Sequence, residues 1–224
     1  MIYEKSAVVD HIWQYSRYYG NLLISCEEIS KEKNLNGHAS LIYLFNILEN
    51  VIKSQLHDYD TSFIKAIDKL KSQNYINNIE YEFLNNKEHG IRKIRNLLAH
   101  ENLSKYNIIF LSEDEKLLYP LTENETSIKF YDLTSKIIFN LMLKIISSNS
   151  IAPITIDIDK TIIDFKIKIE EISAEQLLEY KGINYRTLKG WNEMPEVEQY
   201  RMAENASDVN HYIELFQLLG LKGK

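Results

Sequence analysis

The scarcity of residues that end regular structure constrains this chain more than any other feature. Only 3 prolines and 7 glycines interrupt its 224 residues, which favours long regular elements. Up to about residue 103, apolar side chains recur at steps of three and four residues, the period of an amphipathic α-helix. The pattern predicts five helices, over residues 6–33, 39–57, 63–70, 76–87 and 91–103. Asp60 or Thr61 can cap the third helix, and the short links predict a compact antiparallel bundle.

The period changes after this bundle. Short apolar runs separated by acidic turns are typical of β-strands, and three such runs follow, at residues 106–111, 116–121 and 127–130. We expect them to form a β insertion. Asp132 or Thr134 can then cap a strongly apolar helix around residues 137–146, which we expect to lie inside the bundle.

A shift in composition after residues 147–150 predicts a boundary between a helical bundle, residues 1–149, and an accessory unit, residues 151–224. Alternating isoleucines predict a β-hairpin at the start of this unit, and helices are expected after it. The predicted segments are the hairpin strands 154–158 and 163–169, then helices at 174–181, 185–191 and within 195–219. The predicted fold class is mainly α: a helical bundle with a short β insertion and a small C-terminal α+β unit.

Composition excludes several classes of protein. A single cysteine, Cys26, rules out a disulfide framework and a multi-thiolate zinc site. The first residues lack the features of a signal peptide, and no run of 18 apolar residues occurs, so a cytoplasmic protein with no membrane contact is expected. The net charge of −6 gives no general reason to expect nucleic acid as a partner. A nucleic-acid function therefore needs a local cationic site.

Residues 91–102 provide such a site. On a helix, the apolar side chains of Ile91, Ile94, Leu97 and Leu98 fall within an arc of about 120°. The opposite face gathers the polar residues Arg92, Lys93, Asn96 and His100, with Arg95 on its flank. This face places three cations, an amide and an imidazole together in an acidic protein.

These residue types suit the cleavage of RNA. A histidine such as His100 can take a proton from the ribose 2′-hydroxyl or give one to the leaving oxygen. The guanidinium of Arg95 can bind the scissile phosphate and stabilise the charge that develops on it, and Asn96 can orient the imidazole or the sugar. The reaction requires both a proton acceptor and a proton donor, which two chains meeting face to face would supply.

The sequence Arg95-Asn96-Leu97-Leu98-Ala99-His100 resembles the Arg-Asn-x-x-x-His motif of the HEPN superfamily. These are small helical domains, many of them metal-independent endoribonucleases of toxin–antitoxin, abortive-infection and CRISPR systems. The resemblance covers residues 1–149. It implies a homodimer with a composite site, catalytic or phosphate-binding roles for Arg95 and His100, and products with a 2′,3′-cyclic phosphate.

The same resemblance implies an RNA substrate, no metal or cofactor, and an antitoxin or defence-system protein as a possible partner in a bacterial cytoplasm. Arg92 and Lys93 are expected to hold the RNA backbone, and Asn96 to support catalysis. Many HEPN proteins paired with a minimal nucleotidyltransferase carry a tyrosine two residues after the histidine. Asn102 stands there in this chain, which argues against that pairing.

Two alternatives remain open. The same bundle can be a catalytically inactive interaction or regulatory protein, or residues 173–191 can form a DNA-binding helix-turn-helix that starts at the cap Ser173. Residues 151–224 hold 9 basic and 13 acidic residues, a net charge of −4, which opposes DNA binding.

Within the bundle, Glu49 can face the site and fix Arg95. Cys26 follows the apolar pattern of its helix and is expected to be a buried, inert thiol.

Overall fold

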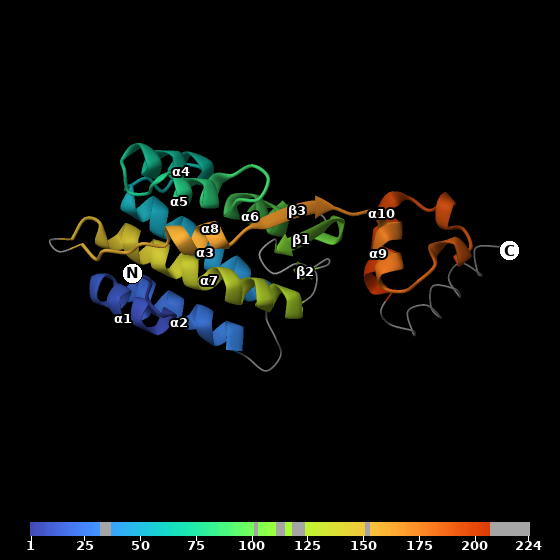
Figure 1. The fold of residues 1–224 in the computed structure, drawn as a ribbon, viewed down its shortest axis with the longest axis horizontal. Coiled ribbons are helices and arrows are strands. Elements are labelled where there is room, and N and C mark those ends of the chain that lie inside the picture. The colour runs from blue at the N-terminus through green and yellow to red at the C-terminus, as the bar shows by residue number, and fades with distance from the viewer. Residues whose placement is uncertain (32–36, 101–102, 111–114, 118–123, 151–152, 207–224) are drawn as a thin grey trace.

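The structure, a computed structural model, is mainly helical, which confirms the predicted class at this level. It describes residues 1–31, 37–100, 103–110, 115–117, 124–150 and 153–206. The described residues form ten α-helices, three short 3-10 helices and one three-stranded sheet (Figure 1). Among them, no helix is long and apolar enough to cross a membrane.

Two long helices form the centre of the bundle. Helix α3 packs along α7, with α1 and α2 on one side and α4 and α5 on the other (Figure 1). The bounds are α1 Lys5–Tyr15, α2 Arg17–Lys31, α3 Gly37–Gln55, α4 Phe63–Ser72, α5 Asn78–Asn85, α6 Ile91–His100 and α7 Asn124–Ser147. The predicted apolar stripe of α3, which includes Leu41, Leu44 and Leu48, is fully buried in this core.

The single helix predicted over residues 6–33 is wrong, because the chain breaks at Ser16. This residue is extended, and its hydroxyl accepts a hydrogen bond from the backbone N–H of Tyr19 at the start of α2. Serine side chains often begin helices in this way. Gly20 then lets the Trp13 ring pack directly on the α2 backbone, since a Cβ there would lie 2.3 Å from Trp13 Cδ1. The apolar period continues across the break and conceals it.

The N-terminal caps of α4 and α5 differ from each other. Helix α4 follows Ser62, whose side chain makes no capping bond, so the prediction of Asp60 or Thr61 as its cap is wrong. Helix α5 begins with a capping box, in which the Asn77 side chain accepts from Glu80 N–H and the Glu80 carboxylate accepts from Asn77 N–H. Glu80 is fully buried and also binds Lys144 of α7 at 2.6 Å, so this cap ties α5 to the centre of the bundle.

The predicted β insertion is partly correct. Strand β1, Tyr106–Phe110, follows the short 3-10 helix η1, Leu103–Lys105, and pairs antiparallel with β2, Glu115–Leu117. Residues 118–121 of the second predicted strand lie outside the described residues.

The third predicted strand, 127–130, is wrong, because these residues lie within α7. Ser127, Phe130, Tyr131 and Thr134 are all buried, and their spacing is helical. Asp132 and Thr134 therefore lie inside the helix, and neither caps it. The Thr134 hydroxyl donates to the Phe130 carbonyl at 2.7 Å.

The predicted hairpin is also wrong. The segment 153–158 has no regular structure, and the short helix α8, Asp159–Asp164, precedes a single strand β3, Ile167–Glu171. Strand β3 pairs antiparallel with β1 to give the sheet order β2-β1-β3. The Asn77 side chain donates to the Asp159 carboxylate at 2.8 Å, which fixes α8 against α5.

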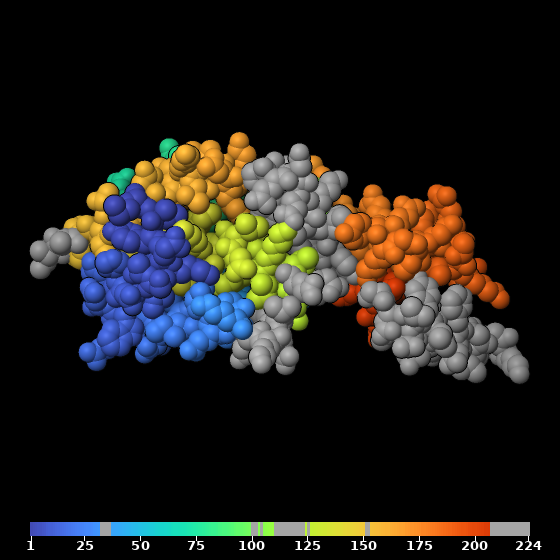
Figure 2. All heavy atoms as spheres, turned by 60° about the horizontal axis from the view of Figure 1, so that its bottom comes forward, coloured from blue at the N-terminus to red at the C-terminus, as the bar shows by residue number. Residues whose placement is uncertain are grey.

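The described residues form two hydrophobic cores, and the change from one to the other comes later in the chain than residue 150. Ile156, Ile158, Ile162 and Ile167 pack in the core of the bundle, and a second core begins at Ala174. The C-terminal unit around this second core forms a lobe beside the bundle (Figure 2). It contains α9 Ala174–Tyr180, the 3-10 helices η2 Tyr185–Thr187 and η3 Trp191–Glu193, and α10 Glu196–Asn205.

Within the C-terminal unit, Ser173 caps α9 as predicted. The helix predicted over 185–191 is wrong: two 3-10 turns replace it, separated by residues 188–190, and Gly190 has a left-handed φ of 80°. A helix-turn-helix therefore lacks its recognition helix here. The predicted extension of α10 to residue 219 lies outside the described residues.

Candidate functional site

Helix α6 carries the sequence motif and packs against α3 and α5. Ile91, Ile94 and Leu97 are buried, and Leu98 is partly buried against the bundle core, which confirms the predicted apolar stripe. The link before the helix is tight, since a Cβ on Gly90 would lie 2.6 Å from Asn86 N. Helix α6 is therefore fixed at its start and along its buried side, and its opposite face points outward.

Arg95 is held by three groups. Its Nη2 lies 2.8 Å from Glu49 Oε2, its Nη1 donates to Asn96 Oδ1 at 3.3 Å, and its guanidinium lies 6.0 Å from the Phe63 ring centre. The Arg95 side chain is 32% exposed. The predicted contact between Glu49 and Arg95 is confirmed, and Arg95 and Asn96 are brought together.

Glu49 binds two cations at once. Lys53 Nζ lies 2.8 Å from its second oxygen, and the Glu49 side chain is only 12% exposed. The trio of Glu49, Lys53 and Arg95 therefore carries one net positive charge, and its side chains are partly buried. A net cation with a guanidinium held in one orientation can bind an anionic group such as a phosphate.

Arg92 and Lys93, the two other cations of α6, contact neighbouring elements. Arg92 Nε donates to Asn85 Oδ1 of α5 at 2.6 Å. Lys93 Nζ instead lies 5.3 Å from the ring centre of Tyr106 on β1. The two predicted RNA-binding cations thus contact different elements, α5 and β1.

His100 is the last residue of α6, and its side chain lies outside the described part of the structure, as does Asn102. Of the other histidines, His11 packs on the Tyr3 ring and His38 lies 3.1 Å from Asn124. Among the described side chains, no histidine contacts Arg95 or Asn96, and no group of three His, Cys, Asp or Glu is placed to hold a metal ion.

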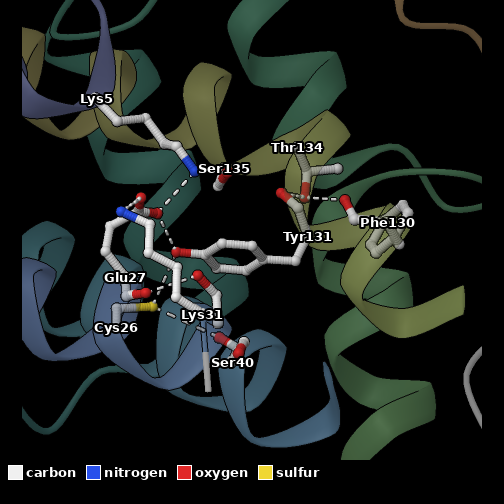
Figure 3. Close-up of polar contacts among 10 residues, drawn as sticks. Lys5, Cys26, Glu27, Lys31, Ser40, Phe130, Tyr131, Thr134 and Ser135 are labelled. Atoms are coloured by element: carbon white, nitrogen blue, oxygen red, sulfur yellow. Dashed lines mark hydrogen bonds and ion pairs between the residues drawn. The ribbon is translucent and has the colours of Figure 1, made fainter. Parts of the chain in front are cut away.

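A second polar cluster lies between α1, α2 and α7 (Figure 3). Glu27 Oε1 accepts hydrogen bonds from Lys5 Nζ and from the Tyr131 hydroxyl, both at 2.7 Å, and Lys5 also donates to Ser135 at 3.2 Å. Burial raises the pKa of Tyr131, so its hydroxyl remains a donor. Burial alone would raise the pKa of Glu27, but the hydrogen bonds from Lys5 and Tyr131 lower it overall. These groups satisfy one another and hold three helices together.

Cys26 borders this second cluster and is fully buried, as predicted. Its sulfur lies 3.5 Å from the Tyr131 hydroxyl oxygen, and its thiol donates to the Ser40 carbonyl at 3.7 Å. Burial raises the pKa of Cys26 to about 11. Since the thiolate is the nucleophilic form, this cysteine is inert at neutral pH.

Several residues around α6 were missed by the sequence reasoning. Lys53 follows Glu49 by four residues, a spacing that signals a helical ion pair. Phe63 and Asn85 lie on other helices, and no local pattern connects them with α6.

Comparisons of this chain with protein-family models, with curated proteins and with solved structures find no match. The functional interpretation therefore depends on the motif, on the chemistry of its residues and on the contacts of α6.

Proposed function

We propose that this chain is a HEPN-type endoribonuclease that cleaves RNA without a metal ion, as a homodimer, and acts as a toxin or antiviral effector in the cytoplasm. One observation carries the proposal. The Arg-Asn-x-x-x-His sequence lies on one bundle helix, where the arginine is fixed by Glu49 and by the neighbouring Asn96.

In the proposed reaction, the ribose 2′-oxygen attacks the adjacent phosphorus and the bond to the 5′-oxygen breaks. One imidazole takes the proton of the 2′-hydroxyl, and a second gives a proton to the leaving 5′-oxygen. His100 would provide one imidazole from each subunit. Arg95 would stabilise the charge on the phosphate oxygens, while Asn96 supports it and Arg92 and Lys93 hold the backbone.

An active ribonuclease would harm its own cell, so the proposal includes a restraint. An antitoxin or another defence-system protein would bind this chain until it is needed. A catalytically inactive HEPN protein that only binds a partner is the competing function.

The decisive experiment measures cleavage of total RNA and of a labelled oligonucleotide in the presence of EDTA. The wild type is expected to cleave, and His100→Ala and Arg95→Ala are expected to lose at least about a hundredfold in rate, the usual effect of removing an acid–base group or a charge-stabilising donor. Mass spectrometry of the products should find 2′,3′-cyclic phosphate ends. His89→Ala and Arg201→Ala, at exposed positions outside α6, are matched controls.

Activity that survives in both α6 variants would overturn the proposed site. A folded wild type that cleaves no RNA would overturn the ribonuclease proposal and favour the inactive interaction protein.

A further inference from the structure

A chain of hydrogen bonds runs from α4 through α5 to Arg92 on α6. Asp68 Oδ1 accepts from the Tyr81 hydroxyl at 2.9 Å and from Asn85 Nδ2 at 3.2 Å. Asn85 Nδ2 also donates to the Tyr81 oxygen at 2.9 Å, and Asn85 Oδ1 accepts from Arg92 Nε at 2.6 Å. Four side chains from three helices thus form one connected network.

The network fixes the direction of each hydrogen bond. The hydrogen bond to Asp68 raises the pKa of Tyr81, so the phenol keeps its proton and donates it to the carboxylate. Because the Asn85 amide nitrogen donates to both Tyr81 and Asp68, its oxygen must face α6. The only orientation of the Asn85 amide that satisfies its partners therefore presents an acceptor to Arg92.

This arrangement determines which edge of Arg92 can bind a ligand. A guanidinium grips a phosphate with two parallel N–H groups, from either the Nε–Nη edge or the Nη1–Nη2 edge. Asn85 occupies Nε, which leaves the Nη1–Nη2 edge of a half-exposed side chain.

We propose that Asp68, Tyr81 and Asn85 are positioning residues that hold Arg92 so that its two terminal nitrogens bind one backbone phosphate of single-stranded RNA. This inference rests on the proposed function for the identity of the ligand. A guanidinium already held in its binding orientation loses less side-chain freedom when the phosphate arrives, and this raises affinity. A lysine at position 92 would lack both the Nε donor and the paired edge.

The experiment measures binding of a fluorescent single-stranded RNA oligonucleotide by anisotropy over a range of salt concentrations. His100→Ala is the background, so that the RNA is not consumed. Arg92→Ala should weaken binding about tenfold and reduce the salt slope by about 0.7, the value for one phosphate contact on a single strand. Asn85→Ala and Tyr81→Phe should weaken binding by about two- to fivefold, the usual effect of one hydrogen bond.

A double-mutant cycle separates positioning from a general structural effect. In the Arg92→Ala background, Asn85→Ala should cause no further loss of affinity. Asn78→Ala and Tyr75→Phe are matched controls: Asn78 is exposed on the same helix, and the Tyr75 hydroxyl binds Asn149 away from α6. Both should bind RNA as the background protein does.

Equal losses from Asn85→Ala with and without Arg92 would overturn the positioning role, as would unchanged affinity in Asn85→Ala. Wild type that binds RNA through Arg92 and Asn85 but does not cleave it would refute the ribonuclease and keep this inference. Cleavage by the wild type, together with additive effects at positions 85 and 92, would support the ribonuclease and refute the positioning role. A folded protein with no RNA affinity would refute both proposals.

Discussion

At the scale of single residues, the state of Arg95 is the central feature of the site. Its guanidinium is bound to Glu49, whose other oxygen is bound to Lys53. Glu49 is nearly covered, whereas a third of the Arg95 side chain is exposed. Glu49 can therefore orient Arg95 from the protein side and leave part of the guanidinium open to a ligand.

Replacing Glu49 by Gln should lower the free energy of unfolding by about 1–2 kcal/mol. The loss is expected to be smaller than the roughly 3–5 kcal/mol of a fully buried pair, because Arg95 is partly solvated. Lys53 and Arg95 would be left as neighbouring like charges. Urea denaturation monitored by circular dichroism measures the change, with Glu28→Gln, at an exposed position of α2, as control.

The same variant distinguishes two roles of Glu49 in RNA cleavage. If Glu49 orients Arg95, Glu49→Gln should cleave RNA more slowly even though the site gains positive charge. Faster cleavage would show that Glu49 competes with the phosphate for Arg95, and unchanged stability would show that the ion pair contributes little.

The sequence could predict only part of this site. The periodicity of α6 separates its buried and polar faces, so the positions of Arg92, Asn96 and the apolar stripe follow from a helix. The contact with Glu49 could be suggested because α3 was predicted correctly. The contacts of Arg92 with Asn85 and of Lys93 with Tyr106 depend on how helices and strands pack, which local spacing does not encode.

At the scale of elements, the errors in the predicted strands have a common cause. Residues 127–130 and 163–169 combine β-branched and aromatic residues over short runs, where helical and strand periods are hard to distinguish. Residues 127–130 join a buried helix because their inward side chains continue the period of α7. Residues 167–171 form a strand because β1 offers an edge for pairing. Neither partner can be recognised from the local run.

The second polar cluster gives the contacts between α1, α2 and α7 a dependence on pH. The folded state lowers the pKa of Glu27: burial opposes this, but Lys5 and Tyr131 outweigh it through their hydrogen bonds. A carboxylate with a lowered pKa stabilises the fold above its unfolded pKa of about 4.3. That contribution is lost as the pH falls through the folded pKa.

Glu27→Gln should therefore be less stable than the wild type at pH 7, and the difference between the two should shrink below about pH 4. Urea denaturation at pH 7, 5, 4 and 3.5 measures both curves, and Glu28→Gln should follow the wild type throughout. A difference that stays constant over this range would contradict the role of Glu27 charge.

At the scale of the whole molecule, the C-terminal unit docks on the segment that follows α6. Lys105 Nζ lies 2.6 Å from Glu196 of α10 and 4.9 Å from the Tyr200 ring centre, and the Tyr200 hydroxyl donates to the Ile172 carbonyl at 2.6 Å. The bundle and the C-terminal unit thus meet at η1, close in sequence to the motif.

In a chain with a net charge of −6, RNA binding would depend on the few cations of α6 and its neighbours. Two such faces in a dimer would double the number of these cations.

The proposed composite site makes a quantitative prediction about mixed dimers. The motif supplies one histidine per chain, and no other described histidine contacts Arg95 or Asn96, so a productive site would require His100 from both subunits. If wild type and His100→Ala protein are mixed in equal amounts and allowed to exchange subunits, only about a quarter of the dimers contain two wild-type chains. Cleavage should then fall to about one quarter of that of the unmixed wild type at equal total protein, whereas independent subunits would retain about half. Affinity-tagged subunits verify that exchange is complete, and analytical ultracentrifugation verifies the dimer; a value of one half with complete exchange would show that each chain cleaves RNA alone.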